Sequence, residues 1–409
     1  MQTERRYRSL LVNPFFLNGL IWLVVLMVYQ LGWSRLCPSL SDGMLFFLIS
    51  TSVLSILSGV WYFQYHTISF LPLKDFSVKA ITRCLIVLWI LFIIEIAAAG
   101  GSPLLAYLGV GPKVLYDEFG LAGVHVIVVN GLSCVAIYTF YAYRSTQDKV
   151  VRKRLLYILC ATLLPFILMF NRGGTMTILL GMFLILLLST SSPVKIIWRA
   201  VFVGISILFI FGVMGNMRWK AHGSSGNHLE KIILQVGKAS PEFQKSSIPK
   251  EFFWGYLYIA TPLGNVQNTI NRVKERESDT QDLQDMMLYE FTPEIITKRI
   301  KGEDSKETKK HQAILITQSL NATSVYGRVY KFLGWGGMWA MFAFTMLFIL
   351  INLNIVPKNS KWFLPVLITI DEIIIMNLFD NMFIFMGMIP QLFIFLLIYF
   401  FQRNKIRVN

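Results

Sequence analysis

Three arginines stand at the ends of long apolar runs, where a permanent positive charge needs an explanation: Arg172, Arg218 and Arg328. A guanidinium group is a planar fork of donors that binds carboxylates and phosphates through paired hydrogen bonds. Each arginine alone is compatible with an anchor in lipid headgroups, because long basic side chains reach the interface from helix ends. Together on one side of a membrane, the three side chains predict a clamp for a diphosphate.

Glu95 and His125 are the candidates for moving a proton on that same side. Glu95 lies near the end of one apolar run, in IIEIAAAGG, and His125 lies near the start of the next. Either a carboxylate or an imidazole can serve as a general base. An ion pair with an arginine is the alternative for Glu95, and a packing role is the alternative for His125.

Further acidic residues lie in the apolar region near the end of the chain: Asp371, Glu372 and Asp380. Such residues normally face the interior of a helix bundle and pair with a cation, and a general base is again the alternative. The five histidines lack the spacing of a zinc motif, and there is no Walker A loop. We therefore expect neither a metal nor another cofactor.

The elements that position these residues are membrane helices. The 409 residues are 55% hydrophobic and only 15% charged, with a mean hydropathy of +0.57. Apolar runs of the ~20 residues that cross a bilayer recur along the chain, and the alternation of a barrel is absent. We expect an all-α integral membrane protein with about ten spans and at most twelve. The predicted spans are 15–33, 43–63, 81–99, 121–143, 155–171, 174–190, 194–215, 331–353, 362–379 and 381–402.

Basic residues alternate between the connections of these spans. They gather in the N-terminus, the C-terminal tail and every second connection, as in Arg5, Lys79, Arg152, Lys358 and Arg403. By the positive-inside rule, both termini are predicted to be cytoplasmic. The net charge of +15 then encodes orientation, and we expect membrane lipids rather than nucleic acid as the partner of the basic residues.

The same assignment leaves residues 216–330 in one long segment outside the membrane, between a bundle of residues 1–215 and the last helices in 331–409. A connection of this length is far longer than usual, which favours a functional loop. Its stretch FFWGYLYIA, at 252–260, is too short to span and rich in aromatics. We expect that stretch to lie in, or dip into, the outer membrane interface.

The stretch FNRGGTM, at 170–176, is predicted to be a tight turn between two spans. The preceding span has about 16 apolar residues and reaches roughly 24 Å at 1.5 Å per residue, less than the ~30 Å hydrocarbon core. Arg172 should therefore lie slightly beneath the outer surface. Gly173 and Gly174 permit a sharp reversal and a close approach of the backbone. A cation facing a cavity and a headgroup anchor are the two interpretations.

Several segments together resemble one known family. EIAAAGGSPLL at 95–105 and YDEFGLAGVH at 116–125 are similar to patterns of bacterial oligosaccharide repeat-unit polymerases, the Wzy-type O-antigen polymerases. NRGG at 171–174 is similar to their outward turn with an arginine. GYLYIATPLGN at 255–265 and NATSVYGRVYKFLGWGG at 321–337 resemble their external-loop and helix-start segments. Leu333 departs from the acidic residue that is common before Gly334.

The resemblance implies a membrane glycosyltransferase in the bacterial inner membrane that builds O-antigen or another surface polysaccharide. The enzyme transfers a glycan from undecaprenyl diphosphate to a sugar hydroxyl of the next lipid-linked repeat unit. The catalytic candidates are then Arg172, Arg218, Arg328, Glu95 and His125, which bind diphosphate or take up the acceptor proton. The substrate-binding candidates are Tyr256, Tyr258, Asn265, Asn321 and Tyr326. A chain-length regulator protein is the implied protein partner.

Two other functions remain open at this point. An O-antigen ligase uses the same donor with a different acceptor, and the long external segment fits both enzymes. A flippase or transporter of lipid-linked oligosaccharides would move its substrate without forming a glycosidic bond. The absence of an internal repeat counts against the transporter.

Overall fold

The chain folds into a bundle of helices in the computed structural model, which describes residues 9–112, 114, 118–190, 192, 194–199, 201–202, 204–205, 209, 229–273, 280–301 and 312–408. β-Pairing among these residues is limited to one isolated bridge between Ser34 and Ala239. Five of the helices are long and apolar enough to cross a membrane, and a sixth apolar helix is shorter. The predicted all-α membrane protein is confirmed.

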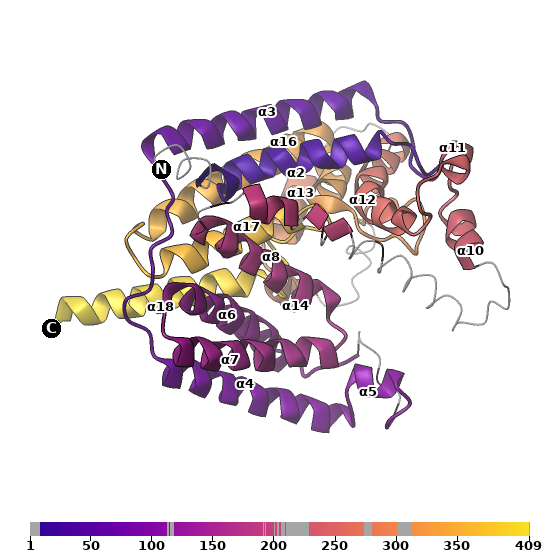
Figure 1. Ribbon diagram of the computed structural model, residues 1–409. Helices are drawn as coiled ribbons and strands as arrows, with labels where there is room; N and C mark the ends of the chain where they lie inside the picture. Colours follow the sequence, from indigo (N-terminus) through magenta and orange to yellow (C-terminus); the bar gives the residue numbers. More distant parts are fainter. Residues whose placement is uncertain are drawn as a thin grey trace.

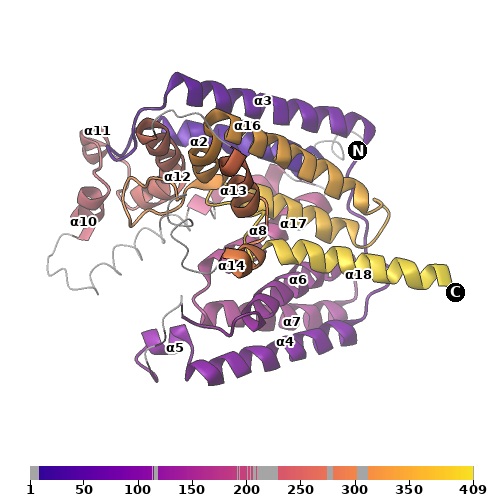
Figure 2. The ribbon, with the colours of Figure 1, turned by 180° about the vertical axis from the view of Figure 1, so that it is seen from behind.

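The first helices are antiparallel neighbours with polar caps. α2 (Pro14–Tyr29) and α3 (Asp42–Tyr65) pack along their whole length, as Figures 1 and 2 show. Asn13 and Ser41 accept hydrogen bonds from the first free N–H groups of these two helices. At Gly19 an added Cβ would lie 2.5 Å from the Ser52 carbonyl oxygen. Small residues thus let the two backbones approach closely, as is common in membrane bundles.

Four more helices complete the first part of the bundle: α4 (Val78–Ala99), α6 (Val124–Ser145), α7 (Lys149–Leu168) and α8 (Arg172–Ser189). Their bounds follow the predicted spans to within three residues, except that α7 starts six residues early, because Asp148 caps it. Gly100, with a φ of 74°, ends α4 in the left-handed conformation that glycine adopts most easily. Half of the predicted span 194–215, including all of 210–215, lies outside the described residues.

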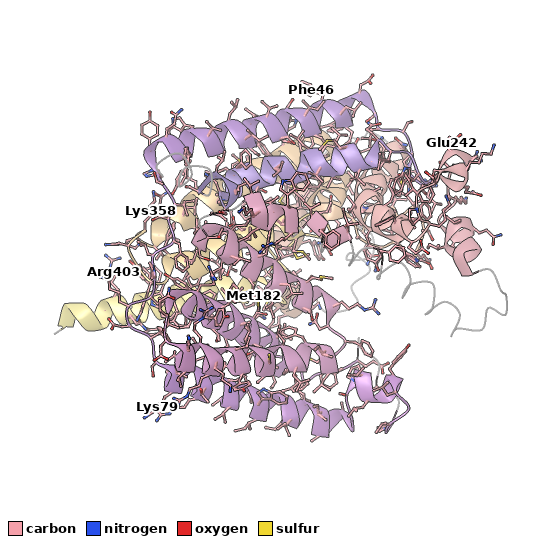
Figure 3. The ribbon with its side chains drawn as sticks, viewed as in Figure 1. Phe46, Lys79, Met182, Glu242, Lys358 and Arg403 are labelled. Carbon is pink, nitrogen blue, oxygen red and sulfur yellow. The ribbon has the colours of Figure 1, made fainter. Side chains whose placement is uncertain are left out.

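The two ends of the bundle differ in what they carry. α5 (Pro103–Tyr107), α10 (Leu229–Val236) and α11 (Pro241–Lys245) lie at one end, which we call the loop end (Figures 1 and 2). Lys79, Lys358 and Arg403 lie at the other, the tail end, whereas Glu242 marks the loop end (Figure 3). This distribution matches the expected alternation of basic connections.

The aromatic stretch 252–260 is helical. It forms the first half of α12 (Phe252–Arg272), which packs against α2 and against α16 (Ser324–Ile355). Phe253, Tyr256 and Leu257 are each at most 3% exposed. These three side chains pack against protein, and the interfacial position of the stretch stays a prediction. Two further helices of the long segment, α13 (Thr280–Glu290) and α14 (Glu294–Lys301), follow α12.

The last helices show two departures from the sequence pattern. α16 starts at Ser324, before the predicted 331, and is broken at Leu333 and Gly334, where Gly334 has a φ of 56° and a ψ of −137°. α17 (Phe363–Met376) ends early, and α18 (Ile389–Val408) starts well after the predicted 381. Between them, residues 377–388 form an irregular segment that we call the 377–388 strap.

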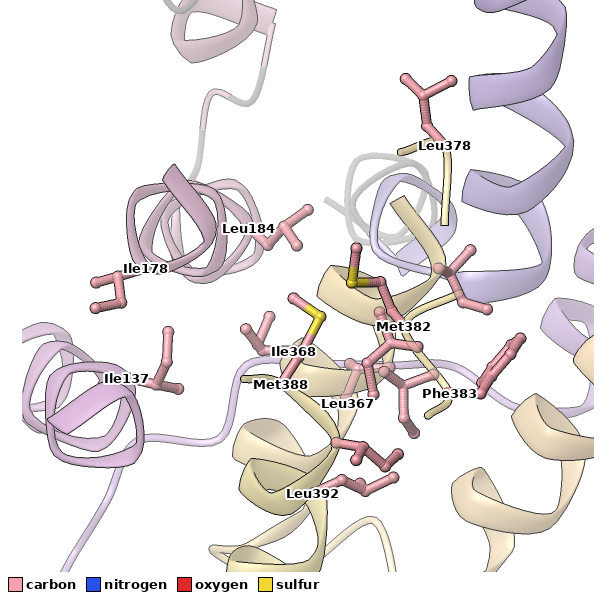
Figure 4. Packing of buried hydrophobic residues seen from close by; sticks show 14 of the residues in the cluster. Ile137, Ile178, Leu184, Leu367, Ile368, Leu378, Met382, Phe383, Met388 and Leu392 are labelled. Carbon is pink, nitrogen blue, oxygen red and sulfur yellow. The ribbon is translucent and has the colours of Figure 1, made fainter. Parts of the chain in front are cut away.

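The strap is irregular because its asparagine side chains replace helical hydrogen bonds. Asn377 Oδ1 accepts from the Met382 amide at 2.9 Å, and Asn381 Oδ1 accepts from the Phe383 amide at 3.1 Å. Irregular backbone at this depth is tolerated where it is buried in protein. Met382, Phe383 and Met388 are indeed buried and pack near Leu367 and Leu392 of α17 and α18 (Figure 4).

Candidate functional site

Glu95 and His125, which the sequence places on different helices, meet at the loop end. Glu95 lies on α4 and is 1% exposed. His125 Nδ1 lies 3.3 Å from the Glu95 carboxylate, and the Leu121 amide donates to Glu95 Oε1 at 3.1 Å. The side chain of His125 is 30% exposed, so the dyad has a buried acid and an accessible imidazole.

The glycines of YDEFGLAGVH bring the imidazole to its place. Gly120 has a φ of 111°, and an added Cβ would lie 2.5 Å from His125 Nδ1. Only glycine combines this backbone conformation with so close an approach. Phe119 packs edge-on against the His125 ring, with centroids 5.9 Å apart, and also against Phe92 of α4. Tyr116, the first residue of this pattern, lies outside the described residues.

A carboxylate facing Nδ1 fixes which ring nitrogen carries the proton. When Nδ1–H donates to Glu95, the Nε2 lone pair remains to accept a proton from another group. This is the arrangement of an oriented general base. The structure thus joins two residues that the sequence could offer only as separate candidates.

The NRGG turn reverses the chain by a different device from the one expected. Phe170, with a φ of 56°, is the residue in the left-handed conformation, and the Asn171 amide bonds to the Phe166 carbonyl at 2.9 Å. This closes α7 in the manner of a Schellman motif, with a non-glycine residue at the strained position. Gly174 instead allows close approach, because an added Cβ would lie 2.6 Å from the Phe166 ring.

Arg172 is the first residue of α8, where Asn171 caps the helix by accepting from the Gly174 amide at 2.8 Å. Its side chain is exposed, and it makes no ion pair with any residue that the structure describes. A helix N-terminus already favours anions, so an unpaired guanidinium there adds to that field. Arg172 is therefore available to an anionic ligand.

The turn at 170–176 lies against α5, which begins within the 95–105 stretch. Tyr107 of α5 contacts Phe170 edge-on, with ring centroids 5.3 Å apart. Ser102 caps α5, and α5 packs on α7. α5 directly follows the helix of Glu95. Its contact with Phe170 therefore joins the segment that carries Glu95 to the turn that carries Arg172 at the loop end.

Arg328, in contrast, already has anionic partners. Its Nε lies 3.0 Å from Glu290 Oε1, and its second terminal nitrogen lies 3.1 Å from Asp380 Oδ1. Asn381 of the 377–388 strap completes the cluster by donating to Glu290 Oε2 at 3.1 Å. Burial raises the pKa of Glu290, and the nearby Arg328 opposes that shift. A diphosphate at Arg328 would have to displace two carboxylates.

The acidic residues near the end of the chain follow two patterns. Asp380 pairs with an arginine, as expected. Asp371 and Glu372 are buried in α17 and have no cation partner among the residues that the structure describes. Arg218, the third arginine of the predicted clamp, lies outside the described residues. Of the three arginines, the structure describes only Arg172 and Arg328, and their surroundings differ.

The side-chain amide of Asn265 uses both of its hydrogens and its oxygen in hydrogen bonds. Its amide nitrogen donates to the carbonyl oxygens of Leu320 and Ala322, each at 2.7 Å, and its oxygen accepts from the Ile316 amide at 2.7 Å. These bonds fasten the segment before α16 to α12. A substrate contact by Asn265 would break them, whereas the neighbouring Asn321 is exposed.

The three tyrosine candidates differ in exposure. Tyr326 is 1% exposed and lies between Phe47 and Trp22, at centroid distances of 4.9 and 5.0 Å. Tyr256 is 3% exposed and packs on Trp33. Tyr258 is 42% exposed and is the most exposed of the three.

Some contacts of the loop end have no signal in the sequence. Glu290 and Asn381 lie far apart in the chain and carry no motif, so nothing local predicts their joint contact with Arg328. The left-handed Phe170 is equally hidden, because glycines follow it and would be expected to take that role. No group of three or more His, Cys, Asp or Glu in the described ranges could hold a metal ion.

Comparison of the chain with protein-family models, curated proteins and solved structures found no match.

Proposed function

We propose that the chain is a membrane glycosyltransferase that polymerises lipid-linked oligosaccharide repeat units. It transfers a glycan from undecaprenyl diphosphate to a sugar hydroxyl of the next lipid-linked unit, at the loop end of the bundle. In this proposal the loop end faces the periplasm, the membrane is the bacterial inner membrane and both termini are cytoplasmic. A chain-length regulator is the proposed protein partner.

The contact between Glu95 and His125 is the observation that carries this proposal. These residues begin and end two sequence patterns that resemble the polymerase family, and they meet at 3.3 Å. The NRGG turn, a third such pattern, lies against α5 through Tyr107 and Phe170. Two of the patterns thus meet in one titratable dyad, and this contact supports the proposal.

In the proposed reaction, one residue deprotonates the acceptor and another stabilises the leaving group. The acceptor hydroxyl gives its proton to His125 Nε2 while its oxygen forms the new bond to the anomeric carbon of the donor. The bond from that carbon to the diphosphate oxygen breaks, and the diphosphate leaves with the electron pair. Arg172 stabilises the charge that develops on this leaving group. Glu95 stabilises the imidazolium.

The proposal predicts polymerisation by the isolated protein. The full chain, reconstituted in lipid vesicles with purified undecaprenyl-diphosphate-linked repeat units, should yield a ladder of longer lipid-linked glycans and free undecaprenyl diphosphate. Electrophoresis of labelled glycan measures the ladder. The repeat units should come from the bacterium that makes this protein. If the protein forms no product with those units, the proposal is contradicted.

Two further outcomes of the same experiment identify the alternatives. Glycan transfer that occurs only when lipid A core is added would assign the chain as a ligase. Movement of the labelled units across the vesicle membrane without a new glycosidic bond would assign it as a flippase. Either result replaces the polymerase proposal.

A further inference from the structure

α17 lies at the centre of the bundle and carries two adjacent acidic residues. It packs against α2, α6, α8, α16 and α18, and its residues from Phe363 to Ile374 are all buried. Asp371 is 0% exposed and Glu372 is 1% exposed. Figure 4 shows apolar side chains around this part of the helix, among them Ile368 of α17, Ile137 of α6 and Leu184 of α8.

Glu372 is fitted between α6 and α8. Its Oε1 occupies the space where a side chain at Gly181 of α8 would begin, 2.0 Å from the ideal Cβ position. Ile137 and Ile368 line the same notch. Glu372 Oε1 has no hydrogen-bond partner among the described residues. The glycine thus admits a carboxyl group into a contact that is otherwise apolar.

Asp371 faces a different neighbour, because successive helical residues point about 100° apart. Both of its carboxyl oxygens are buried without a hydrogen-bond partner in the described part of the chain. A third buried acceptor, Asn130 Oδ1 on α6, is likewise without a donor there. Asn130 uses both of its amide hydrogens on the carbonyls of Val126 and Met386.

The groups that lie next to Glu372 are neutral. α6 contributes the thiol of Cys134 and α8 contributes Gly181, and Cys134 Sγ donates to the backbone carbonyl of Gln391 of α18 at 3.7 Å. Among the described residues, no Lys, Arg or His pairs with either carboxyl group. Two adjacent carboxylates in such surroundings would cost many kcal/mol in lost solvation, beyond their mutual repulsion.

We infer that Asp371 and Glu372 form an intramembrane proton-binding site, in which Glu372 is a neutral carboxylic acid at neutral pH. A proton suits this site better than a metal cation, because a cation needs several oxygen ligands arranged around it. The notch at Gly181 has room for a carboxyl group but offers Glu372 Oε1 no hydrogen-bond donor, which suits an uncharged carboxyl group. Release of the proton would leave a charge in an apolar contact, so the site holds its proton as long as α6, α8 and α17 stay packed.

Infrared spectroscopy of the full-length protein tests this directly. A protonated carboxyl group has a C=O stretching band that is distinct from the carboxylate bands and that shifts in D2O. The difference spectrum between the wild type and Glu372→Gln at neutral pH should contain this band. A difference spectrum that contains only carboxylate bands for Glu372 would overturn the inference.

Thermal unfolding in detergent micelles gives a second test. Gln has nearly the shape of neutral Glu, so Glu372→Gln should leave the unfolding midpoint unchanged or raise it. Glu290→Gln is the matched control, because Glu290 is also buried but is ion-paired with Arg328, and its midpoint should fall. A fall for Glu372→Gln as large as for the control would show an ionised, paired Glu372 and contradict the inference. Neither test uses a glycan substrate, so their outcome is separate from that of the proposed function.

Discussion

At the scale of single residues, the loop end separates two kinds of charged group. Glu95 and His125 form a dyad with an accessible imidazole, and Arg172 is exposed without an ion-pair partner in the described chain. Arg328 is neutralised by Glu290 and Asp380. The residue type alone could not separate Arg172 from Arg328, because the partners of Arg328 come from distant segments. Their surroundings leave Arg172 more available than Arg328 to an anionic ligand such as the diphosphate of the proposed reaction.

Arg328 is predicted to contribute mainly to stability. Its replacement by Ala leaves Glu290 buried without a cation, and this should lower the free energy of unfolding by about 3 kcal/mol. Chemical denaturation in micelles measures the loss. The exposed Arg172→Ala change should leave that free energy nearly unchanged. Equal stability of the two variants would show that the Arg328 cluster is not a structural ion pair.

At the scale of elements, the helices follow the apolar runs, but their junctions depend on tertiary contacts. The bounds of α3, α4 and α6 agree with the sequence pattern because polar caps and glycines mark their ends. The start of α18 was missed because Asn377 and Asn381 bind the backbone of the 377–388 strap and Glu290. The contacts of 252–260 with α2 and α16 were not predicted, because an aromatic run looks the same against lipid and against protein.

Asn265 connects two of these elements, and its replacement separates a structural role from a substrate role. Asn265→Ala leaves the Ile316 amide and the carbonyls of Leu320 and Ala322 without their partner, which should cost about 2 kcal/mol of unfolding free energy. Asn354→Ala, at an exposed helical position, is the control. A loss of polymer with unchanged stability in Asn265→Ala would instead assign Asn265 to the substrate.

At the scale of the whole molecule, one end of the bundle carries the candidate site and the other carries the basic connections between the first helices and before the last. Lys79, Lys358 and Arg403 lie at the tail end (Figure 3), while the dyad at the end of α4 and the NRGG turn after α7 lie near α5 at the loop end (Figure 1). Charge alternation predicted this division, because it depends on the order of connections and not on packing. The Glu95–His125 contact needed the fold, because the sequence places these residues 30 positions apart on different helices.

The elongation of lipid-linked repeat units by His125→Ala tests the central claim most directly. In reconstituted vesicles, loss of the general base should lower the initial rate of glycan transfer by about 100-fold or more, measured at a temperature below the unfolding midpoint of the variant. His66→Ala is the matched control, because His66 follows α3 at the opposite end of that helix from the loop end, and it should retain the wild-type rate. Wild-type elongation by a folded His125→Ala protein would contradict the account.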